Sequence, residues 1–287
     1  RGSGALGLER REFLTQERAD DFFRTKKLHY INKLLVLDCA ESTNTLCKSD
    51  EISVGTAVLA RTQTAGHGRL GRGFLSEDCG IYISFCLSAN IKADRLGVIT
   101  GMTAVAVLHT AKRICGIDAS VKWLNDILFD GRKICGILAE PTFSGAEYPD
   151  RIIIGIGFNL NQQKDAFCGD LSETAGSVYA LTGRKSDISD FVFALLEEID
   201  RAVLSAEQGD ISEYLCEYRK ACVNIGKEVY ILPFEKDGLD PKATFEENAS
   251  RADFRTETVI GITDDFELAT SRRVVRSGEA SIKEKGL

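Results

Sequence analysis

A basic stretch, Arg61–Arg72, holds the residues of this chain best suited to bind an anion. It carries three arginines, one histidine and three glycines, and residues 52–76 contain no Asp or Glu although the chain has a formal net charge of -7. Glycine lets backbone N–H groups converge on a phosphate, and arginine adds forked, permanently charged donors. The stretch indicates a local anion site, with a solvated basic turn as the alternative. Probable strands on both sides, 55–60 and 81–86, would hold it in place.

Polar residues also interrupt an apolar sequence at 121–140, where Lys122, Asn125, Asp126 and Lys133 lie in or beside predicted strands. A charged residue inside a buried run needs a partner or a ligand, because burying it alone costs several kcal/mol. One interpretation is an internal Lys–Asp pair between strands. The other is a lysine that binds the carboxylate and phosphate of substrates, with Asp126 and Asn125 near a metal.

The elements that would position these residues follow from hydrophobic periodicity and turn signals. Strands are predicted at 32–38, 55–60, 81–86 and 152–161, with a hairpin of 121–129 and 132–140 joined by Asp130-Gly131. Helices are predicted at 9–27, 42–48, 96–114, 177–182, 188–206 and 211–221. From residue 224 the pattern changes to short strands separated by Gly, Asp and Asn turns, at 227–232, 256–261, 266–270 and 272–276. A small all-β module is therefore expected after a boundary near 223–225.

Composition limits the classes of protein to which the chain can belong. Its 287 residues, 44% hydrophobic, suit one large domain with a small appendage, and no apolar run approaches the ~20 residues of a membrane span. Nine cysteines without a Cys-x-x-Cys spacing indicate free thiols in a cytoplasmic protein rather than a zinc or disulfide framework. The acidic balance argues against nucleic-acid binding by the whole surface. The start, Arg1-Gly-Ser-Gly, resembles a tag remnant.

Five motifs, in this order along the chain, resemble the catalytic domain of the biotin protein ligase family within the biotin/lipoate ligase superfamily. They are Ser42-Thr43-Asn44, Gln63-x-x-Gly66-x-Gly68-Arg69-x-Gly71-Arg72, Lys122-Trp123-x-Asn125-Asp126, Arg132-Lys133-x-x-Gly136-Ile137-Leu138-x-Glu140 and Gly155-Ile156-Gly157-x-Asn159-x-Asn161. The resemblance extends from Leu34 to the C-terminus, where Gly226-Lys-Glu-Val and Ser277-Gly-Glu-Ala-Ser-Ile282 are similar to the C-terminal β module of the family.

The resemblance implies an α+β fold with a mixed β-sheet packed by helices, the class II synthetase-like biotin ligase domain. It would occupy residues 34–223 and bind biotin and ATP. A short helix and the tag remnant would precede it at 1–33, and a small SH3-like β-barrel would follow at 224–287.

The implied activity is that of an ATP-dependent, AMP-forming ligase. Biotin's carboxylate attacks the α-phosphate of ATP, giving biotinyl-5'-adenylate and pyrophosphate, and a lysine of a biotin carboxyl carrier protein then takes the biotin as an amide. The expected cofactors are ATP and Mg²⁺, with biotin as substrate. The expected partner is the carrier of acetyl-CoA carboxylase or a similar enzyme. A homodimer is possible, and neither membrane nor DNA binding is expected.

The resemblance also assigns roles to residues. Lys133 and Arg69 would be catalytic. Biotin would contact Ser42, Thr43, Asn44, Gln63, His67, Gly68, Arg69, Lys133 and Gly136. The nucleotide would contact Arg69, Arg72, Phe74, Lys122, Asn125, Asp126 and Asn159. Mg²⁺ would be held by Asp126 and Asn159.

Four positions depart from the family pattern. His67 replaces the usual first arginine of the loop, and because histidine is only partly charged near pH 7 we expect weaker retention of the adenylate. Phe74 stands where Trp is usual, so adenine would stack on a smaller ring. Leu124 replaces the usual Pro, which affects the expected turn geometry, and Lys283 stands where Arg is common.

Three other functions remain open from the sequence. A lipoate or octanoate-protein ligase of the same superfamily usually carries an Arg-Arg-x-x-Gly-Gly-Gly stretch, which is absent here. A bifunctional ligase and biotin operon repressor needs a DNA-binding domain ahead of Ser42, and 9–27 shows no helix-turn-helix; such a domain would have to be missing from this chain. A non-catalytic binding module is disfavoured because both Lys133 and Arg69 are retained.

Overall fold

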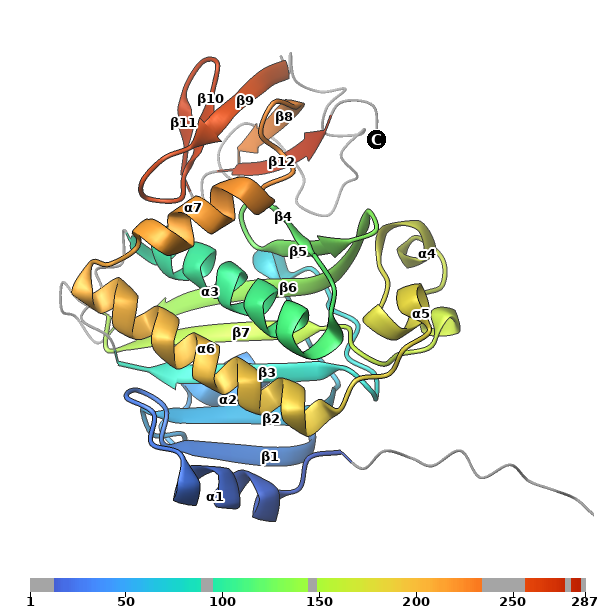
Figure 1. Cartoon of the computed structure of the whole chain (residues 1–287), viewed down its shortest axis with the longest axis vertical. Helices are drawn as coiled ribbons and strands as arrows, with labels where there is room; N and C mark the ends of the chain where they lie inside the picture. The colour runs from blue at the N-terminus through green and yellow to red at the C-terminus, as the bar shows by residue number, and fades with distance from the viewer. Residues whose placement is uncertain (1–12, 89–94, 144–148, 234–255, 277–279, 285–287) are drawn as a thin grey trace, which may run out of the picture.

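A computed structural model describes residues 13–88, 95–143, 149–233, 256–276 and 280–284. Within them a seven-stranded mixed sheet forms the centre of the molecule (Figure 1), in the order β1-β2-β3-β7-β6-β5-β4. Only β1 and β2 pair in parallel; the other neighbours are antiparallel. The strands are β1 Lys33–Ala40, β2 Thr56–Gln63, β3 Ile81–Leu87, β4 Ser120–Lys122, β5 Asp126–Phe129, β6 Arg132–Thr142 and β7 Arg151–Phe158.

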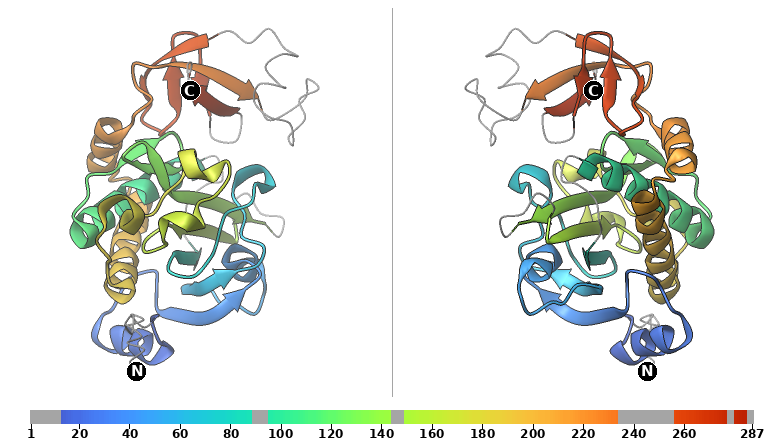
Figure 2. Two further views of the ribbon diagram at one scale, coloured as in Figure 1. Left: turned by 90° about the vertical axis from the view of Figure 1, so that its right-hand side faces the viewer. Right: turned by 90° about the vertical axis from the view of Figure 1, so that its left-hand side faces the viewer.

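Helices cover the two faces of this sheet unequally. The long helices α3, α6 and α7 lie together on one face, and the short helix α2 lies on the other (Figures 1 and 2). β3 is buried along its whole length because both of its faces are covered. The helices are α1 Gln16–Thr25, α2 Thr43–Lys48, α3 Leu96–Thr110, α4 Leu171–Thr174, α5 Val178–Thr182, α6 Ile188–Gln208 and α7 Ser212–Ala221. The expected α+β class is therefore confirmed.

A second, smaller sheet follows α7. Its five antiparallel strands have the order β11-β10-β9-β8-β12, consistent with the expected SH3-like module. They are β8 Glu228–Pro233, β9 Thr256–Ile262, β10 Leu268–Thr270, β11 Val274–Val275 and β12 Ala280–Glu284. The predicted boundary at 223–225 falls between α7 and β8 and stays a prediction. The residues 234–255 and 277–279 between these strands lie outside the described part.

The predicted strand at 121–129 is wrong in one respect: it is two strands, β4 and β5, separated by a turn at residues 123–125. The physical reason is that Trp123 and Leu124 direct backbone groups to distant residues, while Asn125 O accepts from Ile137 N of β6 at 2.9 Å. Trp123 N donates to Asn224 Oδ1 at 2.7 Å, and Leu124 O accepts from the Tyr218 hydroxyl at 3.0 Å. The Asp130-Gly131 hairpin is confirmed between β5 and β6. The predicted helix at 9–27 begins, within the described residues, at Gln16.

The strand β1 lies at one edge of the large sheet and pairs, among the described strands, with β2 alone. The side-chain amide of Gln16, on α1, bonds to its outer backbone groups: Gln16 Nε2 donates to Leu34 O at 2.8 Å, and Val36 N donates to Gln16 Oε1 at 2.9 Å. One side chain thus replaces part of a neighbouring strand.

No helix among the described residues is both long and apolar enough to cross a membrane. All nine cysteines are free, and five of them, Cys47, Cys86, Cys115, Cys135 and Cys222, are buried, where a thiol packs as a small hydrophobic side chain.

Candidate active site

One cavity of about 210 Å³ gathers nearly all of the predicted site residues. It lies where the basic loop, the start of α2, the turn at 123–125 and the middle of β6 and β7 meet. The predicted residues among its lining are Ser42, Thr43, Asn44, Gln63, His67, Gly68, Arg69, Arg72, Phe74, Lys122, Asn125, Asp126, Lys133 and Gly136. Apart from Phe74, these residues come from four separate motifs, and the fold brings them to one place.

The start of α2 forms a polar wall of the cavity. Ser42 caps the helix, with its side chain accepting from Thr45 N at 3.4 Å. Thr43 N and the Thr43 hydroxyl both donate to Gln63 Oε1, at 2.8 and 3.0 Å. Ser84 Oγ, fully buried in β3, lies 2.6 Å from Asn44 Oδ1. The polar wall is therefore fixed before any ligand arrives.

Glu140 supports this wall without lining the cavity. Asn44 Nδ2 donates to Glu140 Oε2 at 2.9 Å, and Lys48 Nζ lies 2.8 Å from Glu140 Oε1. Burial alone would raise the pKa of Glu140, but the hydrogen bonds from Lys48 and Asn44 outweigh it and hold that pKa below its usual value. The carboxylate stays charged and fixes the orientation of the Asn44 amide.

Two glycines of β7 make room for the cavity. A Cβ at Gly155 would lie 2.0 Å from Asn44 Oδ1, and a Cβ at Gly157 would lie 2.4 Å from a ring carbon of Phe74. Both distances are far below van der Waals contact, so any side chain here would displace the polar wall or the aromatic ring. The Gly-x-Gly of the sequence motif has a steric cause.

The basic loop folds back on itself beside the cavity. Gly68 N donates to Arg72 O at 2.8 Å and Phe74 N donates to Gly66 O at 2.9 Å, while residues 69–71 form a single 3-10 turn. Gly71 has a positive φ of 68°, which favours glycine. This arrangement presents the Arg69 side chain to the cavity and leaves Arg72 exposed at its rim.

Arg69 bridges the loop and the turn at 123–125. Its Nη1 donates to Asn125 Oδ1 at 3.3 Å, and the Asn125 amide donates onward to Ile137 O at 2.8 Å. Burial lowers the pKa of Arg69, partly countered by the charge of Asp126. A guanidinium remains protonated under such a shift, so Arg69 supplies a permanent positive charge inside the cavity.

Lys133 forms the ion pair that the sequence left as one of two interpretations. Its Nζ lies 2.6 Å from Asp126 Oδ1 and 5.9 Å from the centre of the Phe74 ring. Because both partners line the cavity and are about one-third exposed, the pair is open to exchange. An incoming phosphate or carboxylate would compete with Asp126 for the ammonium, so the two interpretations are compatible.

The charges around the cavity do not balance. Four permanent cations line it, Arg69, Arg72, Lys122 and Lys133, against the single carboxylate of Asp126. The chain as a whole has the opposite excess, with a formal net charge of -7. A concentration of positive charge in a partly enclosed, low-dielectric space attracts anions. This cavity is therefore built for an anionic ligand.

Asn159 is the predicted site residue that does not line the cavity. Its Nδ2 donates to Gly176 O at 3.1 Å and its Oδ1 accepts from Gln162 Nε2 at 3.4 Å, so the buried amide connects β7 to the segment before α5. Asp126 does line the cavity, so the lining holds only one of the two residues predicted to share Mg²⁺, and their metal site stays a prediction. Within the described residues, no three or more His, Cys, Asp or Glu gather as potential metal ligands.

Two residues at the site escaped sequence reasoning. Ser84 is the one hydroxyl other than that of Tyr82 within the buried strand Ile81–Leu87, and an isolated serine in such a run is the signal that would have found it. Glu140 belongs to a quoted motif, but its contact with Asn44 joins residues 96 positions apart, and no local pattern shows that.

Part of the chain is similar in sequence to known proteins. Residues 36–159 match the family model of the Biotin/lipoate A/B protein ligase family. A "Bifunctional ligase/repressor BirA" of Bacillus spizizenii is 40% identical over 134 residues, covering 46% of this chain and 41% of that protein. The "Biotin--[acetyl-CoA-carboxylase] ligase" of Paracoccus denitrificans is 33% identical over 138 residues, covering 47% and 57%. The matched part thus spans about half the length of these relatives.

Solved structures extend the likeness over most of the chain. The biotin protein ligase from Aquifex aeolicus in complex with biotin and ATP has a TM-score of 0.72 and 26% identity, covering 88% of this chain and 99% of that one. A biotin protein ligase from Leishmania major in complex with biotinyl-5-AMP has a TM-score of 0.56 and 17% identity, covering 88% and 98%, and shows the fold alone. Residues 36–159 of this chain, which match the model of the Biotin/lipoate A/B protein ligase family, carry the first four motifs and the fifth as far as Asn159.

Proposed function

We propose that this chain is a biotin protein ligase, which activates biotin with ATP and transfers it to a lysine of a biotin carboxyl carrier protein. The observation that carries the proposal is the charge imbalance of the cavity, four cations against one carboxylate, next to an ordered polar wall. Joining a carboxylate to a triphosphate brings like charges together, and only a site with excess positive charge lowers that barrier.

In the first step, an oxygen of the biotin carboxylate attacks the α-phosphorus of ATP. A new C–O–P bond forms, the bond from the α-phosphorus to the bridging oxygen of the β-phosphate breaks, and pyrophosphate leaves with that electron pair. Lys133 and Arg69 are the catalytic candidates, because in the cavity Lys133 pairs with Asp126 of β5 and Arg69 donates to Asn125 of the turn at 123–125. Lys133 would exchange Asp126 for the carboxylate and the α-phosphate.

In the second step, the uncharged amine of a carrier lysine attacks the carbonyl carbon of the adenylate. The amide C–N bond forms, the C–O bond breaks, AMP leaves, and the amine gives up its proton. A mixed anhydride of this kind is sensitive to water, so the basic loop must cover it between the two steps. The loop's position beside the cavity, with Arg72 at the rim, suits this covering role.

The binding roles divide the cavity into two halves. Biotin would contact the polar wall of Ser42, Thr43, Asn44 and Gln63, together with the loop residues His67 and Gly68 and with Gly136. The nucleotide would contact Arg72, Phe74, Lys122, Asn125 and Asp126. Asn159 belongs to neither half, because its amide is engaged elsewhere.

ATP would arrive with Mg²⁺ as its counterion, and no residue of the chain is assigned here as a ligand of the metal. The nine free cysteines favour a cytoplasmic setting for this reaction.

Biotin-dependent exchange of labelled pyrophosphate into ATP tests the proposal directly, because it reports the first step alone. The assay would be run with the magnesium salt of ATP, in parallel with biotin, with lipoate and without an acid. We expect exchange with biotin only. Exchange with lipoate instead would assign the chain to the lipoate branch of the family, and no exchange with either acid would contradict ligase activity.

A further inference from the structure

The turn at 123–125 faces the cavity on one side and the protein interior on the other. Trp123 and Asn125 line the cavity, and Asp126 begins the strand that follows. Asn125 holds Arg69, and Asp126 pairs with Lys133. The position of this turn therefore sets the position of both catalytic candidates.

Three hydrogen bonds hold the turn from its interior side. Asn224 Oδ1 accepts from Trp123 N at 2.7 Å, the Tyr218 hydroxyl donates to Leu124 O at 3.0 Å, and the Trp123 indole N–H donates to Phe266 O at 2.9 Å. The three partners come from α7 (Tyr218), from the residues after it (Asn224), and from Phe266, which lies two positions before β10 of the small sheet. All are buried, and Tyr218, Asn224 and Phe266 have no solvent exposure.

The pairing between β4 and β5 does not supply hydrogen-bond partners for these backbone groups. The pairing of β4 with β5 ends at Lys122 and Asp126, so Trp123 N and Leu124 O lie outside it. A buried backbone group that loses its partner keeps the full cost of desolvation, and the turn would move to find another partner. The three partners are 94 to 143 residues away in the sequence and reach the turn only through the tertiary fold.

We propose that Tyr218 and Asn224 are positioning residues for the nucleotide half of the site, acting through the turn at 123–125. They touch no substrate. They hold Asn125 and Asp126 where these residues meet ATP, and the carbonyl of Phe266 extends the same support to the small sheet. This inference rests on the proposed function for its kinetic test, and on the geometry alone for its spectroscopic test.

Tyr218→Phe is the sharpest variant, because it removes one hydroxyl and keeps the ring that packs on Phe266. Tyr214→Phe is a matched control: it lies one turn earlier on α7, is also buried, and its hydroxyl contacts Ser205 instead of the turn. In the exchange assay we expect Tyr218→Phe to raise the KM for ATP about tenfold, the effect of losing one buried hydrogen bond, with the KM for biotin within about twofold. Tyr214→Phe should change neither.

Trp123 provides a readout that does not depend on activity, since it is the only tryptophan of the chain. Its emission reports the turn directly. We expect the emission of ligand-free Tyr218→Phe to shift to the red relative to the wild type and to Tyr214→Phe, as the indole gains contact with water. A merely structural role would lower the thermal midpoint of both variants alike and leave the KM for ATP and the emission unchanged.

The outcomes separate the two proposals. If the wild type shows no biotin-dependent exchange, the proposed function fails, and the emission of the two tyrosine variants still decides whether Tyr218 positions the turn. If the wild type is active but Tyr218→Phe matches Tyr214→Phe in the KM for ATP and in emission, the positioning role is overturned.

Discussion

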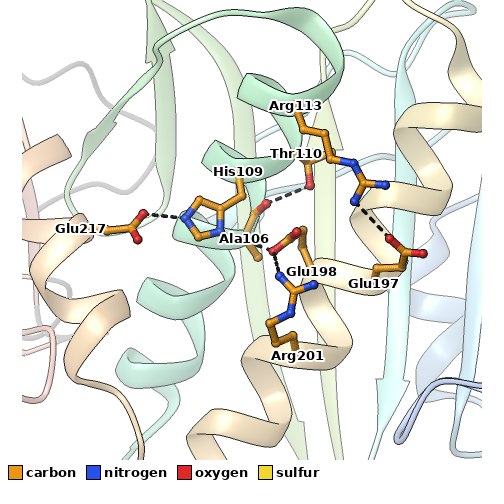
Figure 3. A network of polar contacts seen from close by, with 8 residues as sticks. All are labelled: Ala106, His109, Thr110, Arg113, Glu197, Glu198, Arg201 and Glu217. Carbon is orange, nitrogen blue, oxygen red and sulfur yellow. Dashed lines mark hydrogen bonds and ion pairs between the residues drawn. The ribbon is translucent and has the colours of Figure 1, made fainter.

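Two groups of charged residues lie on opposite sides of the large sheet's core, and they are organised differently. The helix charge cluster consists of His109, Arg113, Glu197, Glu198, Arg201 and Glu217, and it joins α3, α6 and α7 (Figure 3). In it every charged group has a partner of opposite sign. The cavity wall has four cations and one carboxylate.

Distances in the helix charge cluster show how completely its charges are matched. Glu198 is nearly buried and lies 3.4 Å from His109 Nδ1 and 2.9 Å from Arg201 Nη1, while His109 Nε2 lies 2.5 Å from Glu217. Burial alone would raise the pKa of Glu198, yet the hydrogen bond from His109 and the charge of Arg201 keep it lowered. Paired charges of this kind stabilise helix packing, whereas the unmatched charges of the cavity are available to a ligand.

Removing a cavity cation should produce the largest effect on activity. Lys133→Ala deletes the cation expected to contact both reacting groups, so exchange of pyrophosphate into ATP should fall by about 10²- to 10³-fold. Thermal unfolding should change little, because Asp126 stays partly in contact with water. The control is Lys112→Ala, which breaks an exposed pair of the same 2.6 Å length with Asp118. Equal activity of the two variants would contradict the assignment.

Removing a charge from the helix charge cluster should lower the stability of the protein and leave its activity unchanged. Glu198→Gln leaves Arg201 and His109 facing a neutral group, which should reduce the free energy of unfolding by about 2–3 kcal/mol at pH 7. Exchange activity per folded molecule should stay the same. Glu217→Gln, at a partly exposed carboxylate, should cost about 1 kcal/mol or less. Denaturant unfolding measures both values. A loss of activity that exceeds the loss of folded protein would mean that the cluster is linked to the cavity.

The pH dependence of stability should distinguish the helix charge cluster as well. The hydrogen bond to Glu198, aided by that to Glu217, raises the pKa of His109 to about 9. A histidine whose pKa is higher in the folded state contributes its full stabilisation below about pH 6.5, and loses it as the pH rises through about 9. Glu198, Glu217 and Tyr214 face its ring, and Arg201 pairs with Glu198.

We therefore expect the wild type to lose about 1 kcal/mol more unfolding free energy between pH 6.5 and 9 than His109→Gln, after allowance for a side chain that is one-third exposed. Urea unfolding at a series of pH values measures the difference. Parallel curves for the two proteins would show that His109 carries no charge-linked stability.

The smallest effect should come from adding a cation at the edge of the cavity. His67 lines the cavity, and its Nδ1 lies 3.3 Å from Ala65 O. His67→Arg adds a permanent charge near the adenylate, and we expect release of biotinyl-adenylate to slow by about two- to fivefold, the range for a partly exposed charge contact. Release is followed in single turnover by separating bound from free adenylate. His29→Arg, which adds the same charge outside the lining, serves as the control, and release that is no slower than in this control would count against the idea.

Local sequence patterns predicted the parts of this structure that local interactions determine. The helix α2, the Asp130-Gly131 hairpin and the helix α6 each depend on residues within a few positions of one another, and each is where the sequence indicated. The gathering of Thr43, Arg69 and Lys133 in one cavity followed from the family resemblance, since no periodicity reports contact between distant motifs.

The sequence could not predict features that depend on contacts across about a hundred residues. The split between β4 and β5 results from Tyr218 and Asn224, and the support of Asn44 comes from Glu140. Asn159 was expected at the nucleotide because its motif includes it, but its amide is used by Gly176. A buried amide has several possible partners, and only the folded chain determines which one it takes.

The contact between Gln16 and the edge strand β1 affects whether a strand of another protein chain can pair with this sheet. An exposed strand edge is a template on which a foreign strand can add itself by main-chain pairing. Here Leu34 O and Val36 N are already occupied by one amide. A strand of another chain must first displace the Gln16 side chain, which breaks two hydrogen bonds. This displacement does not require α1 to unfold. The Gln16 contact therefore disfavours non-specific strand pairing at this edge. A partner strand that forms more hydrogen bonds with β1 than Gln16 does can still pair there.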